Sequence, residues 1–263
     1  MIYFFSFTNY VIFAHHTICS KYMDLLSSFS SSKKQFAVLV DPDKYDSTKL
    51  LDLVAMAKEA AVSYLFVGGS LLSEGNLDTT IKVIKDNCDI PVIIFPGDEM
   101  QINGRADALL LLSLISGRNP DLLIGKHVIA APYLKRSGLE VLPTGYMLID
   151  SGKSTTALYM SNSLPIPRNK DEIAVSTAMA GEMLGLKLIY MDGGSGAEMP
   201  VSISMIEKVK QNISIPLIVG GGIRTPETAA ERFRAGADII VVGNAIETDN
   251  SLLTRIAEVA YSF

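Results

Sequence analysis

Short apolar runs rich in β-branched residues alternate with longer stretches of helical period from Lys33 onward. Most of the runs are continuous rather than alternating in polarity, which is typical of parallel strands buried on both faces. We expect eight strands, at residues 36–41, 64–67, 91–95, 107–112, 141–149, 187–192, 215–219 and 237–242.

Segments of helical period lie between these strands, for example at residues 47–61, 171–184 and 226–235. Ser47 is a candidate N-cap, and Pro226 stands at a helix start. Strands and helices that alternate along one chain predict an α/β fold, a single (β/α)8 TIM barrel rather than a doubly wound sheet. Residues 96–106 are too few for a helix between the third and fourth strands. We therefore predict a loop there, and a groove on the barrel wall.

The first 23 residues differ from the rest of the chain. They are rich in aromatic side chains, they lack a basic start, and Asn9, His15 and His16 interrupt their apolar stretch. These features argue against a signal peptide. We interpret residues 1–23 as an N-terminal extension that is disordered or not translated, with Met23 as the start, and residues 24–263 as one domain.

Composition removes several classes of function. The net charge of −5 and the pI of about 5.3 do not support nucleic-acid binding. Cys19 and Cys88 provide neither a disulfide framework nor a zinc site, and three histidines argue against a histidine-ligated metal. A hard cation on carboxylates stays open. No apolar run is long enough to span a bilayer.

In TIM barrels the active site lies at the carboxyl ends of the strands. Gly220, Gly221 and Gly222 follow the seventh strand, and Gly243 and Asn244 follow the eighth. Backbone N–H groups in such turns bind phosphate without Arg or Lys. The alternative is a pair of tight turns that need positive φ; two glycine-rich turns at neighbouring strands favour the phosphate site.

Oxygen ligands follow the first two strands. Asp41 and Asp43 end the first strand, and Ser70 follows the second. Mg²⁺ takes one or two carboxylates and completes its shell with water and phosphate oxygens. A capped β-turn is the alternative, but a neighbouring phosphate site favours a magnesium ion that bridges a diphosphate.

The segment from Tyr190 to Gly196 joins a carboxylate to glycine-rich backbone. Asp192 is placed to accept hydrogen bonds from the hydroxyls of a small polyol phosphate, whose phosphate the amides bind; an ordinary surface aspartate is the alternative. His127 lies in a helical pattern and is expected to be a satisfied or exposed helix residue. Lys153 and Arg168 lie near loops, where solvated charge is the default.

Long motifs resemble one known family. FAVLVDPDK, LFVGGS, IGKHVIAAPYLKRSG, YMDGGSGA, PLIVGGGI and VVGNAIE, in this order, are similar to the geranylgeranylglyceryl phosphate synthases of archaea and some bacteria. The resemblance covers residues 24–263. It implies a TIM-barrel prenyltransferase that joins a geranylgeranyl group from its diphosphate to the C3 hydroxyl of sn-glycerol 1-phosphate. It also implies Mg²⁺ as cofactor.

The resemblance also assigns residues. The metal positions fall on Asp41 and Ser70, and Asp192 and Tyr190 are the expected catalytic residues. Two departures stand out: this chain has Asp192 where the family often has Glu, and Leu39 where some relatives have Lys. The substrate-binding positions are Tyr190, Met191, Asp192, Gly193, Gly194, Ser195, Gly196, Gly221, Gly222, Gly243 and Asn244.

Other functions remain as alternatives. A heptaprenylglyceryl phosphate synthase has the same chemistry with a longer donor, and a phosphosugar isomerase or aldolase would need a lysine or a base inside the barrel. A barrel that only binds a phosphate ligand would not need the Asp41–Ser70 pair. We expect a cytoplasmic homo-oligomer that contacts the membrane peripherally. The helix at residues 125–138 is a candidate contact face between subunits.

Overall fold

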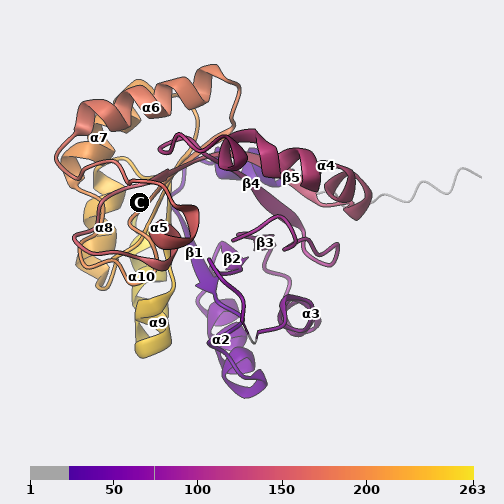
Figure 1. Cartoon of the computed structure of the whole chain (residues 1–263). Coiled ribbons are helices and arrows are strands. Elements are labelled where there is room, and N and C mark those ends of the chain that lie inside the picture. Colours follow the sequence, from indigo (N-terminus) through magenta and orange to yellow (C-terminus); the bar gives the residue numbers. More distant parts are fainter. Residues whose placement is uncertain (1–23, 74) are drawn as a thin grey trace, which may run out of the picture.

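The computed structural model describes residues 24–73 and 75–263. Eight parallel strands close into a barrel in chain order, with β1 paired to β2 on one side and to β8 on the other (Figure 1). The predicted TIM barrel and its eight strands are confirmed. The strands are β1 (Gln35–Val40), β2 (Tyr64–Val67), β3 (Val92–Ile94), β4 (Ala108–Leu114), β5 (Glu140–Leu148), β6 (Leu188–Asp192), β7 (Leu217–Gly220) and β8 (Ile239–Val242).

Helices alternate with the strands and cover the outside of the barrel. The expected helix at residues 47–61 is α2, but its N-cap is Asp46 rather than Ser47, because the Asp46 carboxylate accepts from the Lys49 N–H. The helices are α1 (Leu25–Phe29), α2 (Ser47–Glu59), α3 (Leu77–Asn87), the π-helical turn η1 (Asp121–Gly125), α4 (Lys126–Ser137), α5 (Thr156–Ser161), α6 (Asp171–Met183), α7 (Ile203–Asn212), α8 (Pro226–Arg234), α9 (Asn244–Thr248) and α10 (Ser251–Tyr261).

One helix of the regular pattern is replaced by a loop. Residues 95–107 connect β3 to β4 without a helix, as predicted. Figure 1 shows α3 and α4 on either side of this connection. The layer of outer helices is therefore interrupted between α3 and α4.

Two clusters of buried side chains form the core. One lies between the strands and the outer helices, and the other fills the barrel. Successive strand residues belong to different clusters because their side chains point to opposite faces. The short helix α1 completes the inner cluster: Phe29 stacks on Tyr64 at 4.7 Å between ring centroids, and the Glu140 carboxylate accepts from the N–H groups of Leu25 and Leu26.

The predicted N-terminal extension, residues 1–23, lies outside the described residues. Among residues 24–73 and 75–263, no helix has the length and apolar character that crossing a membrane requires.

Candidate active site

A polar cavity of about 340 Å³ lies at the carboxyl ends of the strands. Most of the residues predicted for the site line it, although they come from five separate strand ends. Met191 and Gly193 do not line it. The Met191 side chain belongs to the outer core cluster, because it alternates with Tyr190 and Asp192 along β6, and the Gly193 N–H donates to the Gly220 carbonyl at 3.1 Å. The predicted residues that line the cavity are Asp41, Ser70, Tyr190, Asp192, Gly194, Ser195, Gly196, Gly221, Gly222, Gly243 and Asn244.

Asp192 is held by hydrogen bonds on both carboxylate oxygens. The Tyr146 Oη donates to Oδ2 at 2.6 Å, and the Gly194 N–H donates to Oδ1 at 2.8 Å. The side chain is 6% exposed, and burial raises the pKa of Asp192 while these two hydrogen bonds oppose the rise. The result is a fixed carboxylate with a strengthened affinity for protons.

Aromatic rings surround this carboxylate. Phe95 stacks on Tyr190 at 5.2 Å between ring centroids, and Tyr146 meets both rings edge to face. Burial raises the pKa of Tyr146 and of Tyr190 well above the usual range for tyrosine. Both phenols therefore stay protonated, and their rings present π faces that favour a nearby cation.

The glycine-rich turns after β6 and β7 lie against each other in the lining of the cavity. Gly221 has φ +82°, and a Cβ there would lie 2.7 Å from the Gly193 nitrogen. Gly222 also has positive φ, at +72°. The N–H groups of Gly222 and Ile223 make no hydrogen bond within the described part of the chain. This backbone fits an anionic group such as phosphate.

Asn244 positions the neighbouring loop. Its Oδ1 accepts from the Gly196 N–H and the Ser195 Oγ, both at 3.0 Å. Arg224 supports the same loop from the other side, where its guanidinium donates to the carbonyls of Ala197 and Glu198. This role of Arg224 was not predicted from the sequence.

Asp41 and Ser70 line the polar cavity from the ends of the neighbouring strands β1 and β2. The Asp41 Oδ1 accepts from the Asp43 N–H at 3.0 Å, whereas Oδ2 has no hydrogen bond to a described residue. Burial raises the pKa of Asp41. A half-buried carboxylate with one unused oxygen, beside a hydroxyl, fits a Mg²⁺ ion that keeps water and phosphate ligands. No group of three or more His, Cys, Asp or Glu residues within the described ranges forms a closed metal site.

Asp43 has a different role from the one that its spacing indicated. Its carboxylate accepts from the N–H and Oγ of Ser73, each at 2.8 Å, and from the Gly75 N–H. It therefore shapes the loop after β2. Glu247, which the sequence analysis missed, lines the cavity from α9; burial, and next the charge of Asp41, raises its pKa.

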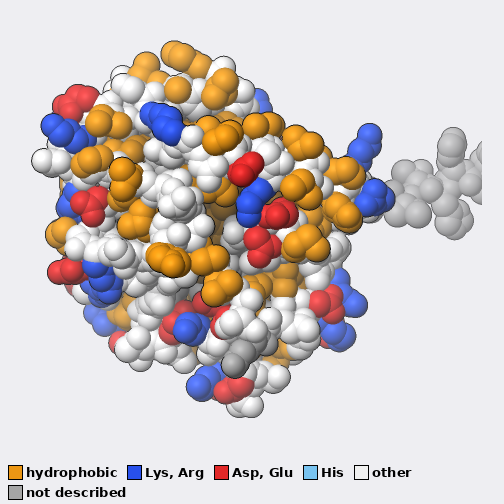
Figure 2. All heavy atoms as spheres, viewed as in Figure 1, with side chains coloured by type: hydrophobic (Ala, Val, Ile, Leu, Met, Phe, Trp, Pro, Cys, Tyr) orange, Lys and Arg blue, Asp and Glu red, His pale blue; other side chains and the backbone are white. Residues whose placement is uncertain are grey.

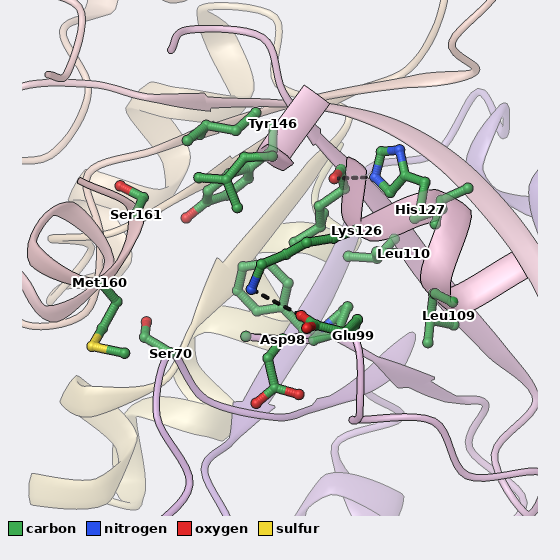
Figure 3. Close-up of a pocket in the computed structure, with 18 of the residues that line it drawn as sticks. Ser70, Asp98, Glu99, Leu109, Leu110, Lys126, His127, Tyr146, Met160 and Ser161 are labelled. Atoms are coloured by element: carbon green, nitrogen blue, oxygen red, sulfur yellow. Dashed lines mark hydrogen bonds and ion pairs between the residues drawn. The ribbon is translucent and has the colours of Figure 1, made fainter. Parts of the chain in front are cut away.

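A second cavity, of about 230 Å³, opens beside the first where the third outer helix is absent (Figure 3). Its walls are mostly apolar and come from the β3–β4 loop, β4, α4 and α5. Residues that line both cavities join them: Gly69, Ser70, Leu71, Phe95, Tyr146 and Ala157. The groove expected on the barrel wall is thus present and meets the polar cavity at the Tyr146 ring.

The remaining polar candidates are occupied elsewhere. His127 Nε2 lies 2.8 Å from the Leu112 carbonyl oxygen, which confirms the expectation of a satisfied helix histidine. Arg168 donates to the Pro200 carbonyl. An ion pair in the apolar cavity, between Lys126 and Glu99, was not expected. Its two members come from different walls, so no local pattern in the sequence points to it.

Comparison with known proteins adds three findings. Residues 29–260 match the model of the PcrB family. The geranylgeranylglyceryl phosphate synthase of Chitinophaga pinensis is 55% identical over 229 residues (87% of this chain, 91% of the relative), and that of Spirosoma linguale is 52% identical over 233 residues (89% and 94%). The (S)-3-O-geranylgeranylglyceryl phosphate synthase of Thermoplasma acidophilum, solved in complex with its substrate sn-glycerol-1-phosphate, has a TM-score of 0.85, with 32% identity and coverage of 92% and 99%.

Proposed function

Since this chain belongs to the PcrB family, we propose that it is a prenyltransferase that moves a geranylgeranyl group from geranylgeranyl diphosphate to the C3 hydroxyl of sn-glycerol 1-phosphate. The products are geranylgeranylglyceryl phosphate and diphosphate. One observation carries this proposal: a polar cavity that holds Asp192 and glycine-rich turns adjoins an apolar cavity at the Tyr146 ring. The first fits a polyol phosphate and the second fits an isoprenoid chain.

The polar cavity positions the acceptor. The turns at Gly221 and Gly222 bind the phosphate, and Asp192 accepts a hydrogen bond from the C3 hydroxyl. In the reaction the hydroxyl oxygen forms a bond to C1 of the prenyl group, and the bond between C1 and the diphosphate oxygen breaks. The leaving diphosphate takes the electron pair, and Asp192 takes the hydroxyl proton. Its raised pKa supports this role as general base.

The aromatic residues serve the prenyl group. Positive charge develops at C1 of an allylic diphosphate as the bond to oxygen breaks. Phe95, Tyr146 and Tyr190 surround the junction of the two cavities. Their π faces stabilise that charge, while burial excludes water that would otherwise capture the cation.

Asp41 and Ser70 are the residues that would hold Mg²⁺. The bound ion would supply positive charge that neutralises the diphosphate. Lys44 also lines the polar cavity. Its positive charge would replace the one that some relatives have from a lysine at the position of Leu39. The side of the cavity that holds Asp41 is therefore the diphosphate side.

Product formation tests this function. Radiolabelled sn-glycerol 1-phosphate is incubated with C15, C20 and C35 prenyl diphosphates, with and without Mg²⁺, for wild type and for Asp41→Ala. We expect an ether product, formed best with the C20 donor, that requires Mg²⁺ and is lost in Asp41→Ala. A preference for C35 would identify the longer donor instead. A folded protein that binds glycerol phosphate and gives no product with any donor would contradict the transferase.

The prenyl donor has an apolar chain and would reach the apolar cavity from a membrane. Exposed apolar side chains lie at and near the mouth of the apolar cavity, where Leu71 and Met160 line it and Tyr159 and Leu164 flank it in sequence. We infer that the protein is cytoplasmic and that it contacts lipid there. Sedimentation with vesicles of neutral phospholipid tests this: wild type should sediment more than Tyr159→Ser/Leu164→Ser, and equal sedimentation would contradict it.

A second exposed apolar surface lies on α4 and fits contact between copies of this chain. Figure 2 shows hydrophobic side chains gathered over α4, where Val128, Ile129 and Tyr133 are exposed. We infer a homo-oligomer that covers this face. Light scattering after gel filtration should give a mass above 28.4 kDa for wild type and a lower mass for Ile129→Asp. A monomeric wild type would contradict the inference.

A further inference from the structure

An ion pair joins the two walls of the apolar cavity. Lys126 Nζ lies 2.8 Å from Glu99 Oε2, and both residues line the cavity. Figure 3 shows the Lys126 side chain pointing toward Glu99. Most of the other lining residues are apolar, among them Ile102, Leu109 and Ala130, although Ser70, Asp98, His127 and Ser161 also line the cavity. Charged side chains in such surroundings are unusual and need an explanation.

The two residues come from elements that frame the missing helix. Glu99 belongs to the β3–β4 loop, and Lys126 is the first residue of α4. His127 fixes the start of α4 on the barrel, since its Nε2 contacts the Leu112 carbonyl of β4 at 2.8 Å. Lys126 is thus held at one wall, and the ion pair ties the β3–β4 loop to it.

The surroundings of the pair favour a directed contact over a chance surface contact. The Glu99 Oε2 atom is buried and makes no hydrogen bond within the described ranges, so its charge is met by the Lys126 ammonium group. The Lys126 side chain is 39% exposed and that of Glu99 is 24% exposed. The pair therefore lies where the cavity meets solvent, with its charged atoms turned toward each other.

We propose that the Glu99–Lys126 ion pair is a strap that closes the apolar cavity over the prenyl chain of the donor. This inference rests on the proposed function. The two side chains are positioning residues: they hold the loop against α4, exclude water from the chain and slow its escape. They affect the affinity for the donor, while the chemical step stays with Asp192 and the diphosphate side.

Kinetics with Glu99→Gln and Lys126→Met test the strap. In each variant we expect the KM for geranylgeranyl diphosphate to rise about two- to fivefold, the range for a partly exposed ion pair, with kcat and the KM for glycerol phosphate unchanged. The reversed pair Glu99→Lys/Lys126→Glu should return the donor KM to within about twofold of wild type, because the attraction is restored. Removal of the Lys82–Asp86 pair on α3, an exposed pair outside the cavity lining, by Lys82→Met is the matched control and should change nothing.

The outcomes separate this inference from the function on which it rests. Wild type without ether product contradicts the proposed function. An active wild type with unchanged donor KM in both single variants contradicts the strap alone. A loss of kcat in Lys126→Met that Glu99→Gln does not share also contradicts it, because Lys126 would then bind the diphosphate. Should a variant melt early, the affinity of wild type for geranylgeraniol, which lacks the diphosphate, still tests the strap. This affinity should weaken between low and high NaCl as the ion pair is screened, and a constant affinity would contradict the strap.

Discussion

Asp192 combines burial with donors on both of its oxygens, and this arrangement sets the balance between reactivity and stability at the site. Because burial raises its pKa in the folded protein, the ionised carboxylate costs folding free energy. The cost is absent below the unfolded pKa of about 3.8, grows as pH rises toward the folded pKa, and is complete above it.

Asp192→Asn should therefore separate activity from stability. We expect kcat to fall about 100-fold or more, since a general base is lost, while the melting temperature at pH 7 stays equal or rises. The advantage of the variant in melting temperature should shrink as pH is lowered toward 4. Calorimetry across this range checks it, with Asp150→Asn, an exposed carboxylate beyond β5, as control. A variant that melts well below wild type at pH 7 would contradict this account.

Tyr146→Phe removes the donor to Asp192 Oδ2 and keeps the ring. The hydrogen bond from Tyr146 lowers the pKa of Asp192, so its loss should raise that pKa further. We expect the acid limb of the pH profile of kcat/KM to move to higher pH, and kcat at its plateau to fall about tenfold. An unshifted acid limb would show that Asp192 is not the titrating base.

The sequence predicted Asp192 as a site residue but did not predict that Tyr146 donates a hydrogen bond to it. The YMDGGSG motif marks a carboxylate before a glycine-rich turn, which is a local pattern. The contact with Tyr146 depends on the register of β5 against β6, where Tyr146 is opposite Tyr190 and Leu148 is opposite Asp192. Register between strands separated by a helix is set by packing of the whole barrel, so one sequence does not specify it.

Among the elements, the turn after β7 carries the sharpest constraint. Alanine at Gly221 would need φ +82° and would place its Cβ 2.7 Å from the Gly193 nitrogen, so the turns after β6 and β7 would separate. We expect Gly221→Ala to raise the KM for glycerol phosphate about tenfold and to lower stability by about 1–2 kcal/mol. Substrate kinetics and thermal melting measure both effects.

Gly185→Ala is the matched control for this turn. Gly185 has φ +90°, a Cβ added there would meet nothing within 4 Å, and the residue follows α6 at the other end of the barrel. Its substitution should cost similar stability with an unchanged KM. Equal effects of the two substitutions on the KM would mean that the close approach at Gly221 does not shape the phosphate site.

Elements were predicted better than their ends and connections. Continuous apolar runs predicted all eight strands. The short segment after β3 predicted that no helix lies between β3 and β4. The N-cap of α2 was wrong by one residue, since Asp46 and Ser47 are both good caps and only the backbone at Asp46 leaves its carboxylate free to accept from Lys49. The tie between Glu99 and Lys126 depends on how the loop folds over the barrel, which no periodicity encodes.

At the scale of the whole molecule, the barrel is closed at one end and open at the other. The short helix α1 closes the end opposite the active site, where Leu25 and Phe29 are buried in the inner cluster. Asp24 caps this helix by accepting from the Ser27 N–H at 2.9 Å. A domain that begins at residue 24 would include the whole of α1 and its N-cap.

A chain of residues 23–263 should consequently retain the melting temperature and activity of the full chain. A chain of residues 30–263 should lose at least about 3 kcal/mol of stability, because it removes Phe29 and Leu25 from the core. Phe29→Ala in the full chain is the control that keeps the helix backbone, and it should account for most of this loss. Thermal and urea unfolding of the full chain, the two shortened chains and Phe29→Ala test this. A lower stability of 23–263 would show that residues 1–22 contribute to the fold. A stability of 30–263 equal to that of the full chain would show that α1 does not stabilise the barrel.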